Sequence, residues 1–331
     1  MHKTARRSVH RALGPLALLP LILTMAAPVG ADSAPSGRIV FSSLPPGTYG
    51  FGTIATTDLF SIRPDGSGIL NLTNTPLADE EQPAISRDGS KILYRVSDRN
   101  LRVSGFELYS ADADGGRVTR ITNDSWAEES PTWTPDGGQI VFSSNRNDPN
   151  PECLLPPCQL DLYVSRSDGS HVRQLTNLRG GAAFFPSVSP DGRTVLFTFI
   201  TDAGDTALYA IGIDGSGLVR LTSFAQEFYH GHWSPDGTRI AFSDQGCISC
   251  TGGSIWTMLG DGTGLRRLTF GTKQSNDYNA QWSPDGQWLT FTRQATKSFS
   301  SSDIYVVRAD GTSETLVIER GVNFESTWGP G

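Results

Sequence analysis

The pair His230 and His232 is the part of this sequence that comes nearest to a metal-binding motif. Residues two positions apart on a β-strand point to the same face, so both imidazoles could bind one metal ion. Gln226 lies nearby, and Asp277 or a glutamate could supply a further ligand. His171 adjoins a turn that we expect at the opposite end of the fold. The sequence therefore predicts no cofactor, with a divalent cation at His230 and His232 as the alternative to simple packing of the two rings.

Carboxylates cluster at two places, residues 79–81 and residues 128–129. A solvated surface explains most such runs, but these clusters would also suit a divalent cation or a basic partner. The sequence contains no Gly-x-Ser-x-Gly elbow and no His-Glu-x-x-His pair. It therefore predicts no catalytic residue and favours binding over catalysis.

A repeated pattern supplies the scaffold for these residues. It consists of an aromatic or aliphatic residue, which we call the anchor, followed by Ser/Thr-Pro-Asp-Gly. The anchors are Ile85, Trp133, Val188, Trp233, Trp282 and Trp328, although the first copy has Arg87 in place of the proline and the last reads Trp-Gly-Pro. Anchors 45–55 residues apart, with four strand signals in each step, are typical of a β-propeller. We expect an all-β, six-bladed propeller of four-stranded antiparallel blades over residues 37–331.

The Pro-Asp-Gly turns have a structural explanation. Proline presets φ in a tight turn, Asp tolerates the next position, and Gly takes the left-handed conformation that follows. We therefore expect these aspartates to be structural. The tryptophan anchors should fill the space between blades, because one four-stranded sheet cannot cover both of its faces.

The two ends of the predicted propeller complement each other. Its first strand, at residues 38–43, resembles the second strand of a blade with no inner strand before it. Its last segment, at residues 324–328, resembles an inner strand with no second strand after it. Pairing of these two segments would complete a sixth blade and close the ring.

The loop-rich end of the central channel is the expected binding surface, since binding residues concentrate on long loops. Counting back from the anchors places carboxylates and aromatic side chains at this mouth. The predicted binding residues are Glu80, Glu81, Glu128, Glu129, Phe184, Phe185, Tyr229, His230, Asp277, Tyr278, Asn279, Phe324 and Glu325.

The first 31 residues read as a secretory signal peptide, and residues 32–36 as a short linker. A basic start precedes an apolar run at residues 13–27, and small residues follow at 29–31. These 31 residues carry four basic and no acidic side chains, so their removal changes the formal net charge from −7 to −11. Such a charge disfavours nucleic acid as a partner. We expect an exported monomer, periplasmic or extracellular, that does not span a membrane after processing.

Four cysteines follow the predicted signal peptide, and an even number in an exported protein suggests disulfides. Three pairings are open. We favour the two local ones, Cys153–Cys158 and Cys247–Cys250, and a redox role for the second pair is the alternative.

The repeated Trp-Ser-Pro-Asp-Gly, Ile-x-Phe, Asp-Leu-Tyr and Asp-Gly-x-Gly-x-x-x-Leu-Thr units resemble the WD40-like (PD40) propeller repeats of the TolB family over residues 37–331. The resemblance implies a six-bladed propeller in the bacterial envelope. In that family the propeller binds the peptidoglycan-associated lipoprotein. TolB proteins carry an α/β domain ahead of the propeller, where this sequence has the predicted signal peptide.

We therefore expect an exported, non-catalytic binding module that recognises an envelope or extracellular protein or peptide at the channel mouth. The alternative is a carbohydrate-active or metal-assisted enzyme around His230 and His232, because polysaccharide lyases on related propellers use a metal bound by His and Gln. A scaffold in the Tol envelope system is a further alternative.

Overall fold

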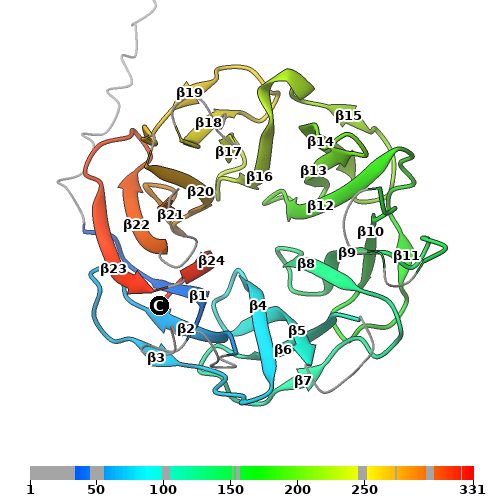
Figure 1. Cartoon of the computed structure of the whole chain (residues 1–331), viewed down its shortest axis with the longest axis horizontal. Helices are drawn as coiled ribbons and strands as arrows, with labels where there is room; N and C mark the ends of the chain where they lie inside the picture. Colours follow the sequence, from blue (N-terminus) through cyan, green and yellow to red (C-terminus); the bar gives the residue numbers. More distant parts are fainter. Residues whose placement is uncertain are drawn as a thin grey trace, which may run out of the picture. The chain divides into compact units, whose positions relative to one another are not determined.

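Six four-stranded antiparallel sheets are arranged in a ring in the computed structural model (Figure 1). The structure describes residues 34–44, 56–98, 105–150, 153, 157–244, 252–272, 274–295, 302–321 and 323–331. It divides into two units, Met1–Ala34 and Pro35–Gly331, and every described strand belongs to the second. The predicted six-bladed propeller is thereby confirmed. The predicted signal peptide lies outside the described residues, and within them no helix is long and apolar enough to cross a bilayer.

Each blade runs outward from an inner strand at the channel. The inner strands are β4 (Ala78–Ile85), β8 (Glu128–Trp133), β12 (Gly181–Val188), β16 (Phe228–Trp233), β20 (Ser275–Trp282) and β24 (Asn323–Gly329). The second strands are β1 (Arg38–Ser43), β5 (Lys91–Asp98), β9 (Gln139–Ser144), β13 (Thr194–Thr201), β17 (Arg239–Asp244) and β21 (Trp288–Ala295). The third strands are β2 (Asp58–Ile62), β6 (Glu107–Asp112), β10 (Asp161–Arg166), β14 (Thr206–Gly212), β18 (Ile255–Leu259) and β22 (Ser302–Arg308). The outer strands are β3 (Leu70–Asn71), β7 (Thr119–Arg120), β11 (Arg173–Gln174), β15 (Val219–Arg220), β19 (Arg266–Arg267) and β23 (Thr315–Gly321).

We number the blades along the chain. Blades 1 to 5 are β4–β7, β8–β11, β12–β15, β16–β19 and β20–β23, and blade 6 combines β24 with β1, β2 and β3. A short 3-10 helix, η1 (Phe224–Gln226), precedes β16. Every inner strand runs towards its anchor, and in blades 1 to 5 a tight turn with Asp-Gly follows. We call that end of the channel the turn rim and the end where the inner strands begin the loop rim.

The turn aspartates bond their own turns, as their local chemistry suggests. Asp88 accepts the Ser86 hydroxyl at 2.6 Å and the backbone N–H of Ser90 at 3.0 Å. Thr134 donates to Asp136 in the same way, at 2.6 Å. These hydrogen bonds favour the charged carboxylate and lower the pKa of Asp88 to about 2. The repeated aspartates hold the β-turns that join the first two strands of blades 1 to 5, while in blade 6 the first two strands are β24 and β1.

The Ile-x-Phe and Leu-Tyr motifs meet inside the blades. Phe142 on β9 stacks on Tyr163 of the paired strand β10, with ring centroids 6.2 Å apart. Phe197 and Tyr209 repeat the arrangement in blade 3 at 5.7 Å. Such cross-strand aromatic pairs stabilise a sheet, and the phenylalanines are fully buried. These rings join larger hydrophobic clusters, and each of the six main clusters of the described residues combines side chains from two neighbouring blades.

Ring closure occurs as predicted. β24 pairs antiparallel with β1, and Ile39 lies opposite Trp328. The indole N–H of Trp328 donates to the carbonyl oxygen of Ser36 at 2.9 Å. The two ends of the propeller are thus held in one sheet, in the blue and red part of Figure 1.

Candidate binding site in the central channel

Each inner strand contains one residue in the left-handed conformation, always three positions before the anchor. None of the six is glycine, and their φ angles lie between 42° and 56°. The strand pairing shifts register at the same point in every blade. We call these residues the bulge ring: Gln82, Ser130, Phe185, His230, Asn279 and Glu325.

Left-handed backbone costs a non-glycine residue about 1–3 kcal/mol. Gln82, Ser130 and Phe185 also precede a proline, which restricts their backbone further. A β-bulge changes the direction of a side chain, and all six members of the bulge ring line one central cavity. The bulges therefore give the channel lining its shape.

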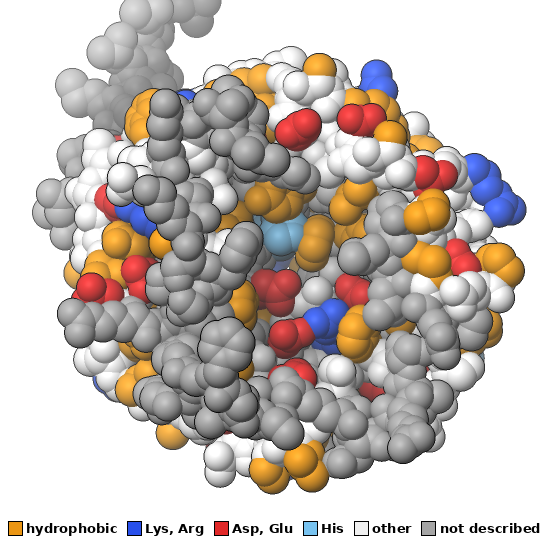
Figure 2. All heavy atoms as spheres, in the orientation of Figure 1, with side chains coloured by type: hydrophobic (Ala, Val, Ile, Leu, Met, Phe, Trp, Pro, Cys, Tyr) orange, Lys and Arg blue, Asp and Glu red, His pale blue; other side chains and the backbone are white. Residues whose placement is uncertain are grey.

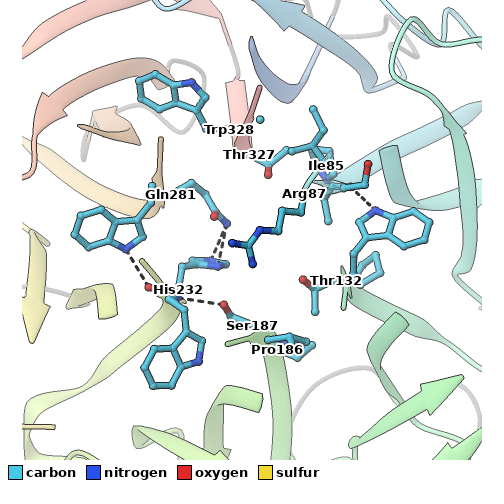
Figure 3. A pocket seen from close by; sticks show the side chains of 18 of the residues that line it. Ile85, Arg87, Thr132, Pro186, Ser187, His232, Gln281, Thr327 and Trp328 are labelled. Carbon is cyan, nitrogen blue, oxygen red and sulfur yellow. Dashed lines mark hydrogen bonds between the residues drawn. The ribbon is translucent and has the colours of Figure 1, made fainter. Parts of the chain in front are cut away.

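The cavity has a volume of about 340 Å³ and lies between the bulge ring and the turn rim. Its wall consists of the inner strands from the bulge ring to the anchors, together with the first residues of the Pro-Asp-Gly turns (Figure 3). The binding residues predicted from the sequence concerned only the loop rim, so a cavity at this end is a new finding.

The predicted binding residues separate into three levels. Phe185, His230, Asn279 and Glu325 belong to the bulge ring and line the cavity. One residue earlier on each inner strand, towards the loop rim, lie Glu81, Glu129, Phe184, Tyr229, Tyr278 and Phe324. Two residues earlier lie Glu80, Glu128 and Asp277.

Glu80, Glu128 and Asp277 are hydrogen-bonded or ion-paired to nearby side chains, and they do not line the cavity. Glu128 is fully buried and pairs with Arg146 at 2.8 Å, while Asp277 pairs with Arg293 at 2.6 and 2.8 Å. Glu80 accepts the Thr73 hydroxyl at 3.1 Å. Burial raises the pKa of Glu80 to about 7 and that of Glu128 to about 8.

Three carboxylates gather around one guanidinium on the channel wall. Arg95 of β5 forms ion pairs with Glu81 of the same blade and, at 3.5 Å, with Glu129 of blade 2. Glu325 of blade 6 interacts electrostatically with all three. Burial raises the pKa of Glu325 to about 7, Arg95 opposes that rise, and Glu81 adds to it. We call these four residues the acidic cluster.

The acidic cluster connects blades 1, 2 and 6. Figure 2 shows carboxylate, cationic and histidine side chains together in the hollow at the centre of one face. Arg95 was not among the predicted residues. The available signal was an arginine within the otherwise apolar stretch from Ile92 to Val96, since such a cation needs a buried partner.

His230 is buried, and neither of its ring nitrogens has a hydrogen-bond partner in the described part of the chain. Its ring packs edge-on against Phe185 and Tyr229. Burial, together with His232, lowers the pKa of His230 to about 3, so its imidazole is neutral at pH 7. Two unpaired nitrogens on a cavity wall can bond a ligand.

His232 also lines the cavity, and its partner is Gln281 of the next blade. The side-chain amide nitrogen of Gln281 lies 2.9 Å from Nε2 and 3.1 Å from Nδ1 (Figure 3). Burial lowers the pKa of His232 to about 4. The described residues contain no group of three His, Cys, Asp or Glu side chains placed to hold a metal ion. The further metal ligands considered beside His230 and His232 have other partners. Asp277 is paired with Arg293, and the side chain of Gln226 accepts the backbone N–H of Ser223.

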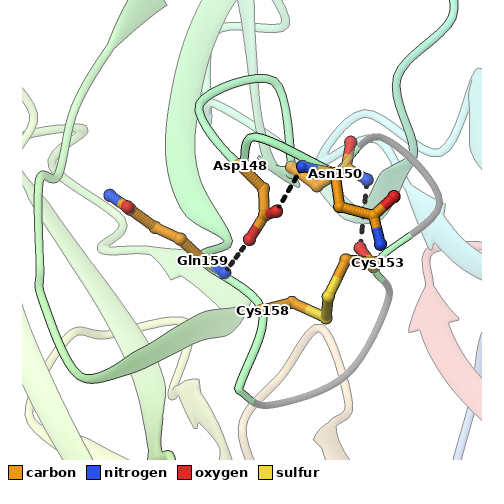
Figure 4. The surroundings of a disulfide bond; sticks show 6 residues. Asp148, Asn150, Cys153, Cys158 and Gln159 are labelled. Carbon is orange, nitrogen blue, oxygen red and sulfur yellow. Dashed lines mark hydrogen bonds between the residues drawn. A yellow bond between two sulfur atoms is a disulfide. The ribbon is translucent and has the colours of Figure 1, made fainter.

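The Cys153–Cys158 disulfide forms as predicted, with Cα atoms 5.5 Å apart (Figure 4). Asp148 accepts the backbone N–H groups of Asn150 and Gln159 beside it. Cys158 packs in a small cluster with Phe184, so one half of the disulfide supports a residue next to the bulge ring. Cys247 and Cys250 lie outside the described residues.

Comparison with known proteins agrees with this fold. The family model described as the TolB beta propeller domain (PD40) matches residues 154–331. The Tol-Pal system protein TolB of Anaeromyxobacter dehalogenans is 33% identical over 162 residues, which are 49% of this chain and 34% of that protein. An uncharacterized protein of Agrobacterium fabrum is 29% identical over 167 residues, which are 47% of this chain and 52% of that protein.

Solved structures extend the similarity to nearly the whole propeller. The crystal structure of TolB from Acinetobacter baumannii has a TM-score of 0.69 and 22% identity, and the match covers 89% of this chain and 67% of that one. At this identity the likeness shows the fold alone. The match to TolB of Anaeromyxobacter dehalogenans spans about a third of that protein's length, and the match to the Agrobacterium fabrum protein spans about half of its length.

Proposed function

Because the chain belongs to the TolB β-propeller domain family, we propose that it is an exported, non-catalytic binding module of the bacterial envelope. Its binding surface is the loop-rim mouth of the channel, and its partner is a protein or peptide. The predicted signal peptide at residues 1–31 supports export.

The asymmetry of the channel lining is the observation that carries this proposal. The turns and cores repeat from blade to blade, yet the six residues of the bulge ring are of six different types. Evenly repeated packing would not require six strained positions with different side chains. A lining that differs around a symmetric scaffold suits recognition of an asymmetric ligand.

The residues one position before the bulge ring, towards the loop rim, indicate the chemistry of the partner. Blades 1 and 2 contribute Glu81 and Glu129, and blades 3 to 6 contribute four aromatic residues. The acidic cluster contains three carboxylates and one guanidinium, so it favours a basic group. Aromatic side chains supply large contact areas at protein interfaces. The expected partner is a segment with a basic residue close to an aromatic or aliphatic one.

A direct binding assay with residues 32–331 tests the proposal. The peptidoglycan-associated lipoprotein is the first partner to try, since the sequence resembles the family that binds it. Affinity capture from an envelope fraction supplies other candidates, which are then purified and titrated. A variant with Glu81→Gln, Glu129→Gln and Tyr229→Ala should lose binding at least tenfold.

A matched control variant removes two negative charges at exposed positions outside the channel. Asp202 and Asp205 are exposed in the β13–β14 turn at the loop rim. Asp202→Asn with Asp205→Asn should leave the affinity unchanged. Equal affinities of the channel variant and this control would contradict a binding surface at the mouth.

The enzymatic alternative predicts a different result. Metal analysis of the purified protein would then find a stoichiometric transition metal that is lost in His230→Ala. The binding-module proposal expects the same metal content in both proteins.

A further inference from the structure

Arg87 occupies the position at which the other five repeats have proline. Those prolines, at 135, 190, 235, 284 and 330, line the cavity at the turn rim. Asp88 and Gly89 keep the turn itself intact in the first repeat. The substitution therefore places one long cationic side chain at the turn rim without changing the scaffold.

The Arg87 side chain extends across the channel. Its Nη1 atom donates to the carbonyl oxygen of Pro190 at 2.9 Å, so it reaches from blade 1 to blade 3. Figure 3 shows the guanidinium directed towards the middle of the lining residues. Arg87 has no carboxylate within 4.0 Å among the described residues. Within the part of the chain that the structure describes, a neutral oxygen is the hydrogen-bond partner of this exposed cation.

The cavity below Arg87 combines apolar walls with unsatisfied polar groups. Trp133, Trp282 and Val188 contribute to its wall. His230 keeps two unpaired ring nitrogens, and the buried hydroxyl oxygen of Ser130 is also without a partner in the described residues. Buried polar atoms are nearly always hydrogen-bonded in folded proteins. Both groups belong to the bulge ring, so they lie on the far side of the cavity from Arg87 and are not partners of a group that Arg87 holds.

The charges of the lining define which end of a ligand faces the turn rim. Arg87 is the only Lys or Arg that lines the cavity, and Glu325 is the only Asp or Glu, among the described residues. Glu325 belongs to the bulge ring, and Arg87 lies beyond the anchors on the other side of the cavity. An anionic group is therefore favoured beside Arg87 and disfavoured at the bulge ring.

We propose that this cavity binds a monocarboxylate with an aromatic or branched apolar body, with its carboxylate on Arg87 and its body among the anchors. A guanidinium binds a carboxylate through two charge-assisted hydrogen bonds, which are stronger than its bond to a backbone carbonyl. The volume of about 340 Å³ is at the lower end of the range of ligand pockets. Arg87 lies at the opposite end of the channel from the proposed protein-binding mouth, so the two ends can be tested separately.

The carboxylate has two natural sources, a free organic acid or the C-terminal residue of a peptide. Phenylacetate represents the first, and N-acetyl-L-phenylalanine the second. Their amides, phenylacetamide and N-acetyl-L-phenylalaninamide, have nearly the same shape without the charge. The acid with the higher affinity identifies the source.

Calorimetric titration of residues 32–331 tests the site, and quenching of tryptophan fluorescence gives an independent readout because tryptophans line the cavity. We expect at least one acid to bind at least tenfold more tightly than its amide. Arg87→Gln should remove that preference. Arg193→Gln is the matched control, since Arg193 is exposed after the turn of blade 3 and does not line the cavity.

Three results would overturn the proposal. The first is no binding of either acid at 10 mM, and the second is equal affinity for acid and amide. The third is an Arg87→Gln protein that is folded by its melting curve and still binds the acid as the parent does. The titration with acids does not depend on partner binding at the loop rim. Each proposal can therefore be contradicted while the other stands.

Discussion

The indole N–H of Trp133 donates to the carbonyl oxygen of Ala84 at 3.1 Å, across the boundary between blades 2 and 1. Trp282 makes the same bond to His232, between blades 5 and 4. Trp233 is the anchor of blade 4, but its indole nitrogen has no partner in the described residues. The same repeat position thus has a hydrogen bond at two blade boundaries and none at a third.

This difference predicts unequal effects of one substitution. Trp133→Phe should lower the free energy of unfolding by about 1–2 kcal/mol more than Trp233→Phe does, because only the first leaves a carbonyl oxygen without its donor. Urea denaturation of both variants measures the difference. Equal losses would show that the indole bonds contribute nothing beyond ring packing.

Arg95 should be the most sensitive residue of the acidic cluster. Arg95→Gln leaves Glu81, Glu129 and Glu325 close together without a cation, and removal of one partner from a buried pair costs about 3–5 kcal/mol. Urea denaturation at pH 8 measures the loss, and adding Glu129→Gln should restore part of it. The exposed Arg166→Gln is the control, and a loss no greater than that of the control would contradict the proposed role of Arg95.

Much of the fold could be predicted because its information is local. The tight turn after an anchor specifies a hairpin, so the four Pro-Asp-Gly turns and the Arg-Asp-Gly turn of the first repeat specify five hairpins. The spacing of the six anchors gives the blade number. Closure by β24 and β1 followed from the missing strand types at the two ends of the repeat array. The bulge ring could not be predicted in this way, since residues as different as Phe185, Asn279 and Glu325 occupy one backbone conformation.

The candidate site was predicted less well than the fold. Consecutive residues of a strand point to opposite faces, so Glu80 and Glu81 could not both face the channel, and the prediction included both. Arg95 and Arg87 were missed as channel residues for a different reason. Each acts on groups from other blades, and a pattern within one repeat contains no information about those neighbours.

His230 should make the protein less stable in acid. Its folded-state pKa of about 3 is below the ordinary value of 6.5, so between these values the unfolded chain binds the additional proton. The stability that neutral His230 contributes is present above pH 6.5 and is lost as the pH falls, by up to about 1.4 kcal/mol per pH unit. His230→Asn tests this, because Asn279 takes the same conformation in the next blade.

Unfolding of the parent and of His230→Asn should be compared at pH 7.5 and pH 5. Glu80, Glu128 and Glu325 have raised pKa values and act in the opposite direction, but they are present in both proteins. The stability difference between the two proteins should therefore shift by about 2 kcal/mol in favour of the variant at pH 5. An unchanged difference would mean that His230 is charged or exposed in the folded state.

Removal of the disulfide should have a moderate effect. Cys153 and Cys158 close a loop with a sequence separation of 5, for which loop entropy predicts roughly 2 kcal/mol. A protein with Cys153→Ser and Cys158→Ser should be less stable by that amount and should no longer respond to reductant through this loop. Thermal melts of parent and variant with and without reductant measure both effects, and unchanged melts would contradict the prediction.

The pairing of β24 with β1 has a consequence for synthesis on the ribosome. β1 emerges early, but its inner neighbour is separated from it by blades 1 to 5, so one edge of β1 stays unpaired until almost the whole propeller has been translated. An unpaired edge can bind another chain. The topology therefore requires that this edge be protected in every newly made chain, either by a chaperone or because the chain folds only after β24 has been made.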